Sequence, residues 1–162
     1  MKKHIANIVT LLNLASGMTS IYLSTLGMFV ESAIMILIAV FFDFIDGRVA
    51  RMLSVESDIG AELDSLSDLV SFGVAPAILV YNQFPQILIM ILGILFVMSG
   101  AYRLARFNSI RKEIKGFVGM PITINGFIFP ILFFASATLN IYYAVLLVST
   151  FMMISTLRFK KI

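Results

Sequence analysis

The sequence has no cysteine and only one histidine, and these two shortages exclude several kinds of chemistry. Without cysteine the chain forms no disulfide and no thiolate metal site. A single His4, close to the N-terminus, does not favour a Ser-His-Asp relay within the chain. Zinc and copper prefer the histidine and cysteine ligands that are missing here, so a metal site of this protein is expected to use oxygen ligands.

Charged side chains are also scarce. They make up 13% of the 162 residues, too few to coat a surface exposed to water, whereas 60% of the residues are hydrophobic. Soluble domains are usually about 45–50% apolar, so the composition predicts a membrane protein. The N-terminal apolar run looks like a signal peptide, but Asn7, Thr10 and Asn13 interrupt it, and we interpret it as the start of the first membrane helix.

Six segments are long and apolar enough to cross a bilayer as helices. The alternating pattern of a membrane β-barrel is absent from the sequence. We therefore expect an all-α membrane protein in which residues 1–162 form one domain, a six-transmembrane-helix bundle. The predicted spans are 7–26, 30–52, 58–80, 86–107, 120–138 and 141–158, with the last break confined to residues 139–141.

The basic residues test this arrangement. With six spans, all twelve lie on one side, at the N-terminus, the second and fourth connections and the C-terminus. The positive-inside rule makes that side the cytoplasm, so both termini are expected to be cytoplasmic and the protein to lie in the cell membrane. The residues are Lys2, Lys3, Arg48, Arg51, Arg103, Arg106, Arg111, Lys112, Lys115, Arg158, Lys160 and Lys161.

Acidic residues gather near the predicted cytoplasmic ends of the second and third helices, with seven of nine between positions 43 and 68. Asp43 and Asp46 are three residues apart, and Asp64 and Asp68 are four apart, so each pair shares a helix face. Two antiparallel helices would bring these four carboxylates around one point. Because they cannot all ionise there without compensation, we expect divalent cations such as Mg²⁺, Mn²⁺ or Ca²⁺. A pair of such ions is the usual clamp for phosphoryl chemistry.

Small residues and an arginine flank the four aspartates. Gly47 and Ala50 would let a bulky ligand lie against the backbone, and Arg51 offers a forked donor that suits phosphate. The competing interpretation is that the acids reach the membrane interface and the small residues only pack helices. Three further acids share no face with the four and are interpreted as solvated turn residues: Glu56, Asp58 and Glu62.

Residues 43–51 (DFIDGRVAR) and 60–68 (GAELDSLSD) resemble the signature of the CDP-alcohol phosphatidyltransferases at every fixed position. The resemblance implies six transmembrane helices and a site with two metal ions, Mg²⁺ or Mn²⁺, that displaces CMP from a CDP-linked lipid. It also implies a homodimer, and nucleic acid is not an expected partner.

The resemblance further implies roles for single residues. Asp43 and Asp64 would bridge the two ions, Asp46 would bind one, and Asp68 would contact the other and accept the substrate's proton. The N-terminal stretch with Asn7, Thr10, Asn13 and Gly17 is similar to one that lies against the nucleotide in the family, although Ala6 replaces a proline there. Contacts with the CDP-lipid are thus expected from Asn7, Thr10, Gly47, Ala50, Arg51, Ser57 and Gly60.

A second stretch bears on the acceptor alcohol. Residues 102–108 (YRLARFN) and 117–121 (FVGMP) are similar to a signature of the phosphatidylserine synthases, with Met120 where that signature has leucine. The resemblance implies transfer of the phosphatidyl group of CDP-diacylglycerol to L-serine, giving phosphatidylserine and CMP. Arg103 and Arg106, three residues apart, would pair with the serine carboxylate, and Asn108 is assigned to the same site. The alternative is that both arginines follow the positive-inside rule and bind lipid head groups.

Other functions stay open on the sequence. The same chemistry could use glycerol 3-phosphate or an inositol phosphate as acceptor, and the lipid could carry acyl or isoprenoid ether chains. A different class is a small divalent-cation transporter, because intramembrane acids often mark ion paths.

Overall fold

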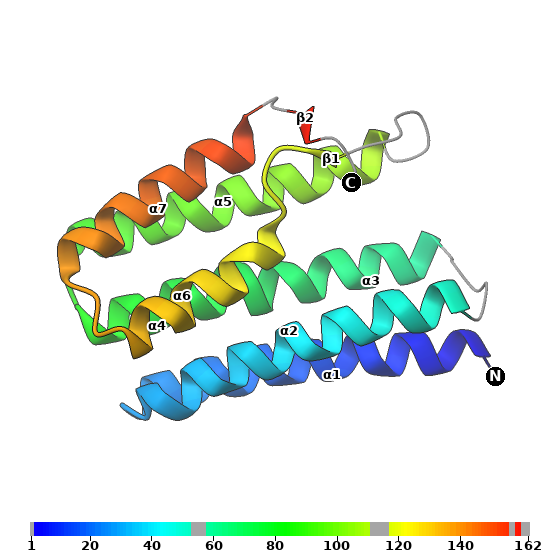
Figure 1. Ribbon diagram of the computed structural model, residues 1–162, viewed down its shortest axis with the longest axis horizontal. Helices are drawn as coiled ribbons and strands as arrows, with labels where there is room; N and C mark the ends of the chain where they lie inside the picture. Colours follow the sequence, from blue (N-terminus) through cyan, green and yellow to red (C-terminus); the bar gives the residue numbers. More distant parts are fainter. Residues whose placement is uncertain (1, 53–57, 111–116, 156–157, 160–162) are drawn as a thin grey trace.

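The computed structural model describes residues 2–52, 58–110, 117–155 and 158–159 (Figure 1). Six helices account for most of these residues, as the hydropathy pattern predicts. The first, second and fourth are unbroken α-helices: α1 (Lys2–Thr25), α2 (Phe29–Met52) and α5 (Ile87–Ile110). The third helix is continuous but changes its winding, from α3 (Asp58–Asp68) through a π-helical turn, η1 (Leu69–Val74), to α4 (Ala75–Gln83).

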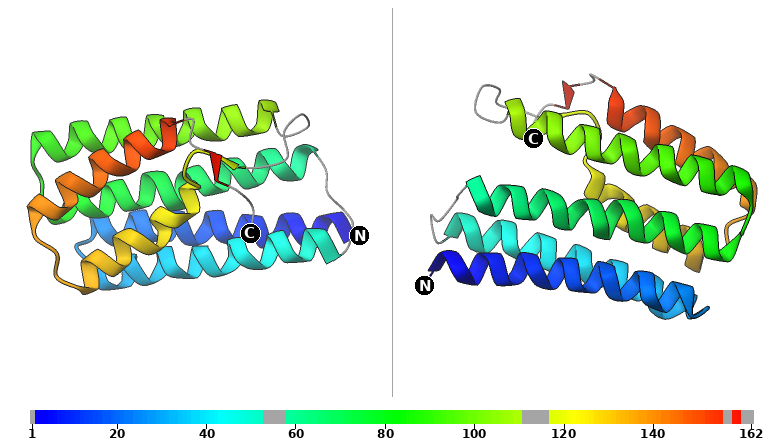
Figure 2. Two further views of the ribbon diagram at one scale, coloured as in Figure 1. Left: turned by 45° about the horizontal axis from the view of Figure 1, so that its top comes forward. Right: turned by 180° about the vertical axis from the view of Figure 1, so that it is seen from behind.

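The helices form three groups that lie side by side. Helices α1 and α2 pack along each other on one long side, and α5 and α7 (Leu139–Ile154) pack on the opposite side. The third helix and α6 (Asn125–Phe134) lie between these pairs (Figure 2). The start of α1, the end of α2, the start of α3 and the end of α5 lie at one end of the bundle, as the charge pattern predicts. Glu31, in the first turn of α2, lies at the other end.

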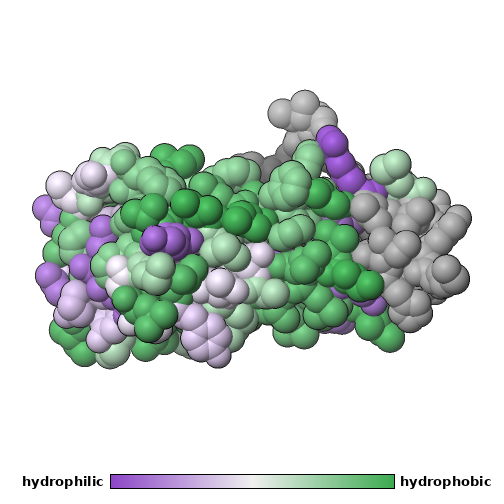
Figure 3. Space-filling model, turned by 90° about the horizontal axis from the view of Figure 1, so that it is seen from below, coloured by the Kyte–Doolittle hydropathy of each residue, from purple (hydrophilic) through white to green (hydrophobic). Residues whose placement is uncertain are grey.

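The outer surface is that of a membrane protein. Large apolar side chains on α5 and α7, such as Ile94, Met98 and Phe151, are exposed over half or more of their surface. Figure 3 shows a face that is hydrophobic along its middle. Among the described residues, three segments are long and apolar enough to cross a membrane: Asn7–Thr25, Asp58–Gln83 and Ile87–Ser109. These segments indicate an integral membrane protein.

The core is built from aromatic and aliphatic side chains between the helix groups. Phe72, Phe96 and Phe129 are fully buried, and the rings of Phe96 and Phe129 meet edge to face at 5.4 Å. Gly126 lets the start of α6 approach closely, since a Cβ there would lie 2.5 Å from the Phe72 ring and 2.6 Å from Val40. This packing fixes α6 against α2 and the third helix.

The predicted fifth helix, residues 120–138, is wrong at both ends. A short antiparallel pair of strands, β1 (Phe117–Val118) and β2 (Arg158–Phe159), and a 3₁₀ turn, η2 (Ile122–Ile124), precede α6. The physical reason is local: Gly119 has φ +78° and Pro121 is extended, so no α-helix runs through these residues.

The predicted last break, residues 139–141, is also displaced. Those residues begin α7, and the turn lies before them, where Ser136 has φ +52° and Thr138 is extended. Helix α7 then ends at Ile154, short of the predicted 158, because Arg158 pairs in β2. Apolar composition alone did not reveal either boundary.

Candidate metal centre

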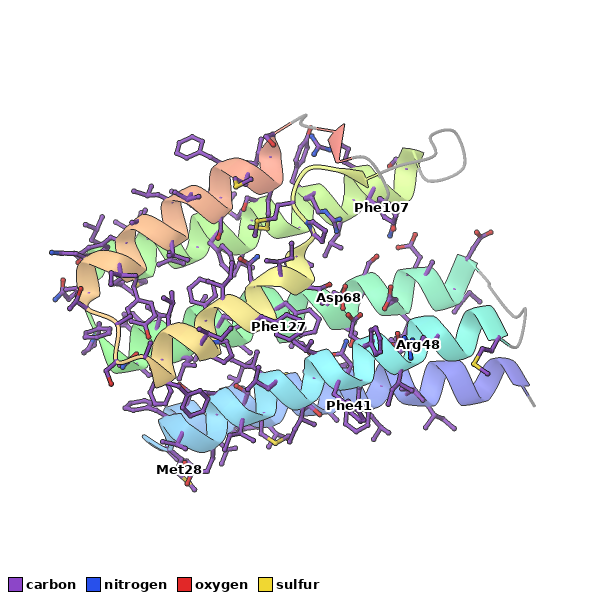
Figure 4. All side chains as sticks on the ribbon, in the orientation of Figure 1. Met28, Phe41, Arg48, Asp68, Phe107 and Phe127 are labelled. Atoms are coloured by element: carbon purple, nitrogen blue, oxygen red, sulfur yellow. The ribbon has the colours of Figure 1, made fainter. Side chains whose placement is uncertain are left out.

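Three carboxylates converge where α2 faces α3. Asp43 comes from α2, and Asp64 and Asp68 come from α3; one oxygen of each lies within 4.8 Å of the others. Asp68 is 7% exposed, whereas Asp43 and Asp64 are half-buried. The carboxyl groups of Asp43 and Asp68 are close enough to share a hydrogen bond. Figure 4 shows Asp68 on the inner side of its helix, next to α2.

Asp46 stands beside this group of three. It is buried and interacts electrostatically with Asp43 and Asp64, and its carboxyl group is hydrogen-bonded to the Thr10 side chain. Its Oδ2 atom is buried and has no hydrogen-bond partner among the residues that the structure describes. Helical spacing therefore brings all four predicted aspartates to one region, with Asp46 on its α1 side.

The donor set fits a hard divalent cation. Carboxylates packed this closely and removed from water repel one another unless protons or cations intervene. Their oxygen atoms are the ligands that Mg²⁺, Mn²⁺ and Ca²⁺ prefer. The buried oxygen of Asp46, which has no partner in the described part of the chain, adds an acceptor to the same region.

Helix α1 lines the third side of the cluster. The Asn13 Nδ2 atom donates to Asp68 Oδ1 at 3.4 Å, and the Ser67 hydroxyl donates to the Thr10 carbonyl at 3.0 Å. The π-helical turn begins directly after Asp68 and brings the Ser71 hydroxyl to the Asn13 carbonyl, at 3.1 Å. π-turns inside helices often mark functional sites. The sequence places Asn13 in the N-terminal stretch that resembles a nucleotide-contacting stretch of the family, but it predicts no contact of Asn13 with an aspartate.

The two arginines predicted for serine occupy different surroundings. Arg103 is only 5% exposed, lies within electrostatic reach of Asp68, and keeps a buried Nε without a partner among the described residues. Arg106 donates to the carbonyls of Met153, Ile154 and Ser155 at 3.0–3.3 Å. Its guanidinium therefore ties the end of α7 to α5.

Asn108 joins α5 to α3. Its Nδ2 atom donates to Glu62 Oε2 at 3.2 Å and to Ser65 Oγ at 3.1 Å. Glu62, interpreted from the sequence as a solvated turn residue, lies inside α3, although it is exposed. Asn108 thus lies near the helix that carries Asp64 and Asp68.

The residues predicted to contact the CDP-lipid are only partly described. Asn7 on α1, Gly47 on α2 and Gly60 on α3 are half-buried on the three helices that surround the aspartates. Ala50 and Arg51 belong to α2, but their side chains lie outside the described part of the chain, and Ser57 lies wholly outside it.

The comparison with known families decides the relationship. Residues 3–158 match the CDP-alcohol phosphatidyltransferase family. The chain belongs to the CDP-alcohol phosphatidyltransferase family. The match covers almost the whole chain and includes every aspartate of the cluster, so the membership that residues 43–68 suggested is confirmed.

Several similar proteins are named as enzymes that form serine-containing phospholipids. The chain is 47% identical to the CDP-diacylglycerol–serine O-phosphatidyltransferase of Methanocaldococcus jannaschii over 118 residues, 73% of this chain and 54% of the relative. It is 44% identical to the archaetidylserine synthase of Methanothermobacter thermautotrophicus over 124 residues, 73% and 52% respectively. The CDP-diacylglycerol–serine O-phosphatidyltransferase of Bacillus subtilis is 40% identical over 136 residues, 81% and 76% respectively. The chain thus spans about half the length of the two archaeal relatives.

Proposed function

We propose that this protein transfers the phosphatidyl group of CDP-diacylglycerol to L-serine, forming phosphatidylserine and CMP. The observation that carries the proposal is the group of three carboxylates within 4.8 Å, in a chain whose family acts on CDP-alcohols. The names of the relatives that we compared support serine as the acceptor.

The proposed metal site is formed by Asp43, Asp46, Asp64 and Asp68, which would hold two Mg²⁺ or Mn²⁺ ions. Bound cations would neutralise the diphosphate of the lipid substrate and the charge that develops on the departing CMP. The contacts with the CDP-lipid that the sequence predicts are part of the same proposal: Asn7, Thr10, Gly47, Ala50, Arg51, Ser57 and Gly60.

The proposed reaction is a direct displacement. Asp68 accepts the proton of the serine hydroxyl as its oxygen attacks the phosphorus that bears the diacylglycerol group. The bond from that phosphorus to the bridging oxygen breaks, and CMP departs with the bonding electrons. The buried carboxylate of Asp68, beside both Asp43 and Arg103, is well placed for such a proton transfer.

The proposed serine site centres on Arg103. A zwitterion such as serine needs a cation for its carboxylate, and a buried guanidinium binds a carboxylate more strongly than one in water. Arg103 meets the requirements of this role, because it lies close to Asp68 and its buried Nε has no partner among the residues that the structure describes. Arg106 and Asn108 would support the site from the same end of α5, through their contacts with α7 and α3.

We also propose the membrane arrangement that the charge pattern favours. All six helices would cross the cell membrane, with both termini and the aspartates on the cytoplasmic side. The acyl chains of the substrate would then stay in the bilayer while its head group reaches the cluster. A homodimer is part of the same proposal, by likeness to the family.

An acceptor assay tests the proposed function. Purified protein in detergent would be given CDP-diacylglycerol, Mn²⁺ and, separately, labelled serine, glycerol 3-phosphate or inositol phosphate. We expect CMP release and labelled lipid with serine. Labelled lipid formed with glycerol 3-phosphate or inositol phosphate, and not with serine, would show that serine is not the acceptor. Mn²⁺ flux into liposomes without CMP release would favour a transporter.

The type of hydrocarbon chain on the lipid substrate is a second open question, and the name of one relative bears on it. One relative is named an archaetidylserine synthase, so a CDP-activated isoprenoid ether lipid is a candidate substrate. Offering the acyl and ether CDP-lipids in parallel, at equal surface concentration, gives the preference directly as the ratio of kcat/KM values.

A further inference from the structure

Asn13 is buried at the metal cluster in a way that packing does not explain. It is 0% exposed, its Nδ2 donates to Asp68 Oδ1 at 3.4 Å, and its Oδ1 is buried without a partner among the described residues. A buried amide with an unmet acceptor destabilises a fold, whereas an apolar residue of similar size would not. The asparagine therefore needs a reason beyond filling space.

The backbone around Asn13 is held firmly against the third helix. The Ser67 hydroxyl donates to the carbonyl of Thr10, one turn before Asn13, and the Ser71 hydroxyl donates to the carbonyl of Asn13 itself. At Gly17, one turn later, the two helices approach so closely that a Cβ would lie 2.3 Å from the Ser71 hydroxyl. The amide of Asn13 is thus presented to Asp68 from a fixed position.

We propose that Asn13 is a positioning residue for the metal cluster and acts through Asp68. By donating to Oδ1, the amide fixes the plane of the carboxylate and leaves the second oxygen to a cation. A neutral amide suits this task, because a lysine or arginine at the same place would repel the cation. Thr10 makes the equivalent contact with Asp46 one turn earlier, so α1 would orient one aspartate from each of the other two helices.

This role of Asn13 rests on the proposed metal site, and the expected change in metal affinity follows from known cases. Groups that orient a metal ligand by hydrogen bonding typically change metal affinity by about 10- to 100-fold when removed. We therefore expect Asn13→Leu, which keeps much of the volume, to weaken Mn²⁺ binding by that factor. Asn13→Ala, which removes the amide and introduces no larger side chain, should weaken Mn²⁺ binding by a similar factor.

The test is a Mn²⁺ titration of purified protein in detergent, without lipid or serine, with free Mn²⁺ measured by electron paramagnetic resonance. The matched control is Ser20→Ala, which removes a buried hydrogen bond between α1 and Ser32 of α2 and leaves the contacts of Asn13 in place. We expect Ser20→Ala to lower the thermal midpoint but to bind Mn²⁺ as tightly as the unchanged protein does.

Each outcome decides the matter. Weaker Mn²⁺ binding in a folded Asn13→Leu or Asn13→Ala variant, but not in Ser20→Ala, supports the role of Asn13. Mn²⁺ binding as tight as that of the unchanged protein in either folded Asn13 variant, or an equal loss in Ser20→Ala, overturns this role while the proposed function stands. Failure of the unchanged protein to bind Mn²⁺ overturns the metal site itself, and this inference with it.

Discussion

Replacing Gly17 by alanine should separate α1 from the third helix. A Cβ at this position would lie 2.3 Å from Ser71 Oγ, 2.8 Å from Ser71 Cα and 2.9 Å from Ser71 Cβ. Rotation of the Ser71 side chain can relieve the first contact but not the second, because the Cα belongs to the backbone. The two helices must therefore move apart.

The expected magnitude follows from two opposing effects. Adding volume to a packed contact destabilises a protein by about 1–3 kcal/mol, and the backbone clash at Ser71 places Gly17→Ala at the upper end. Alanine is about 1 kcal/mol more favourable than glycine within a helix. The net loss of about 1–2 kcal/mol corresponds to a fall of about 2–8 °C in the thermal midpoint for a chain of this length.

The substitution should also reduce activity by displacing Asn13 from Asp68. The assays are CMP release and the temperature at which half of the protein leaves the monodisperse peak in size-exclusion chromatography. The control is Gly93→Ala in α5, where, among the described residues, a Cβ would contact only Ala77 Cβ, at the ordinary distance of 3.5 Å. If Gly17→Ala matched Gly93→Ala in both stability and activity, the close contact between α1 and the third helix would be refuted.

Four further substitutions test other parts of the structure. Asp68→Asn should abolish CMP release while a fluorescent CDP analogue still binds, and retained turnover would remove Asp68 as the proton acceptor. Arg103→Gln should raise the KM for serine by about 10- to 100-fold, the loss expected for a hydrogen bond to a charged group. Arg106→Gln should mainly lower the thermal midpoint. Equal effects of the two substitutions on the KM would contradict these separate roles. Gly119→Ala should destabilise the protein, because φ is +78° and a Cβ would lie 2.7 Å from the Met153 carbonyl; an unchanged midpoint would show that this turn tolerates a side chain.

The helices and the acidic cluster could be predicted from the sequence because both follow from simple periodicities. Hydropathy reveals segments that must leave water, and spacings of three and four place Asp43, Asp64 and Asp68 on facing helix surfaces. Each of these inferences depends on a single helix or on two helices joined by a short turn.

The rest depends on contacts between segments far apart in the chain. Arg103 and Arg106 look alike in the sequence, yet it is Arg106 that donates hydrogen bonds to the carbonyls at the end of α7. The contact between Asn13 and Asp68 spans 55 positions and requires the close approach of the helices at Gly17. The shortened fifth helix depends on the backbone angle of Gly119, which an apolar pattern does not encode.

The most direct test of the central claim is CMP release before and after removal of divalent cations. Purified protein would be dialysed exhaustively against a chelator, then assayed with CDP-diacylglycerol and serine, with and without added Mn²⁺. We expect no CMP without Mn²⁺ and full recovery when it is restored, and no recovery in Asp64→Asn, which lacks one of the three converging carboxylates. Undiminished CMP release after complete chelation would contradict the account.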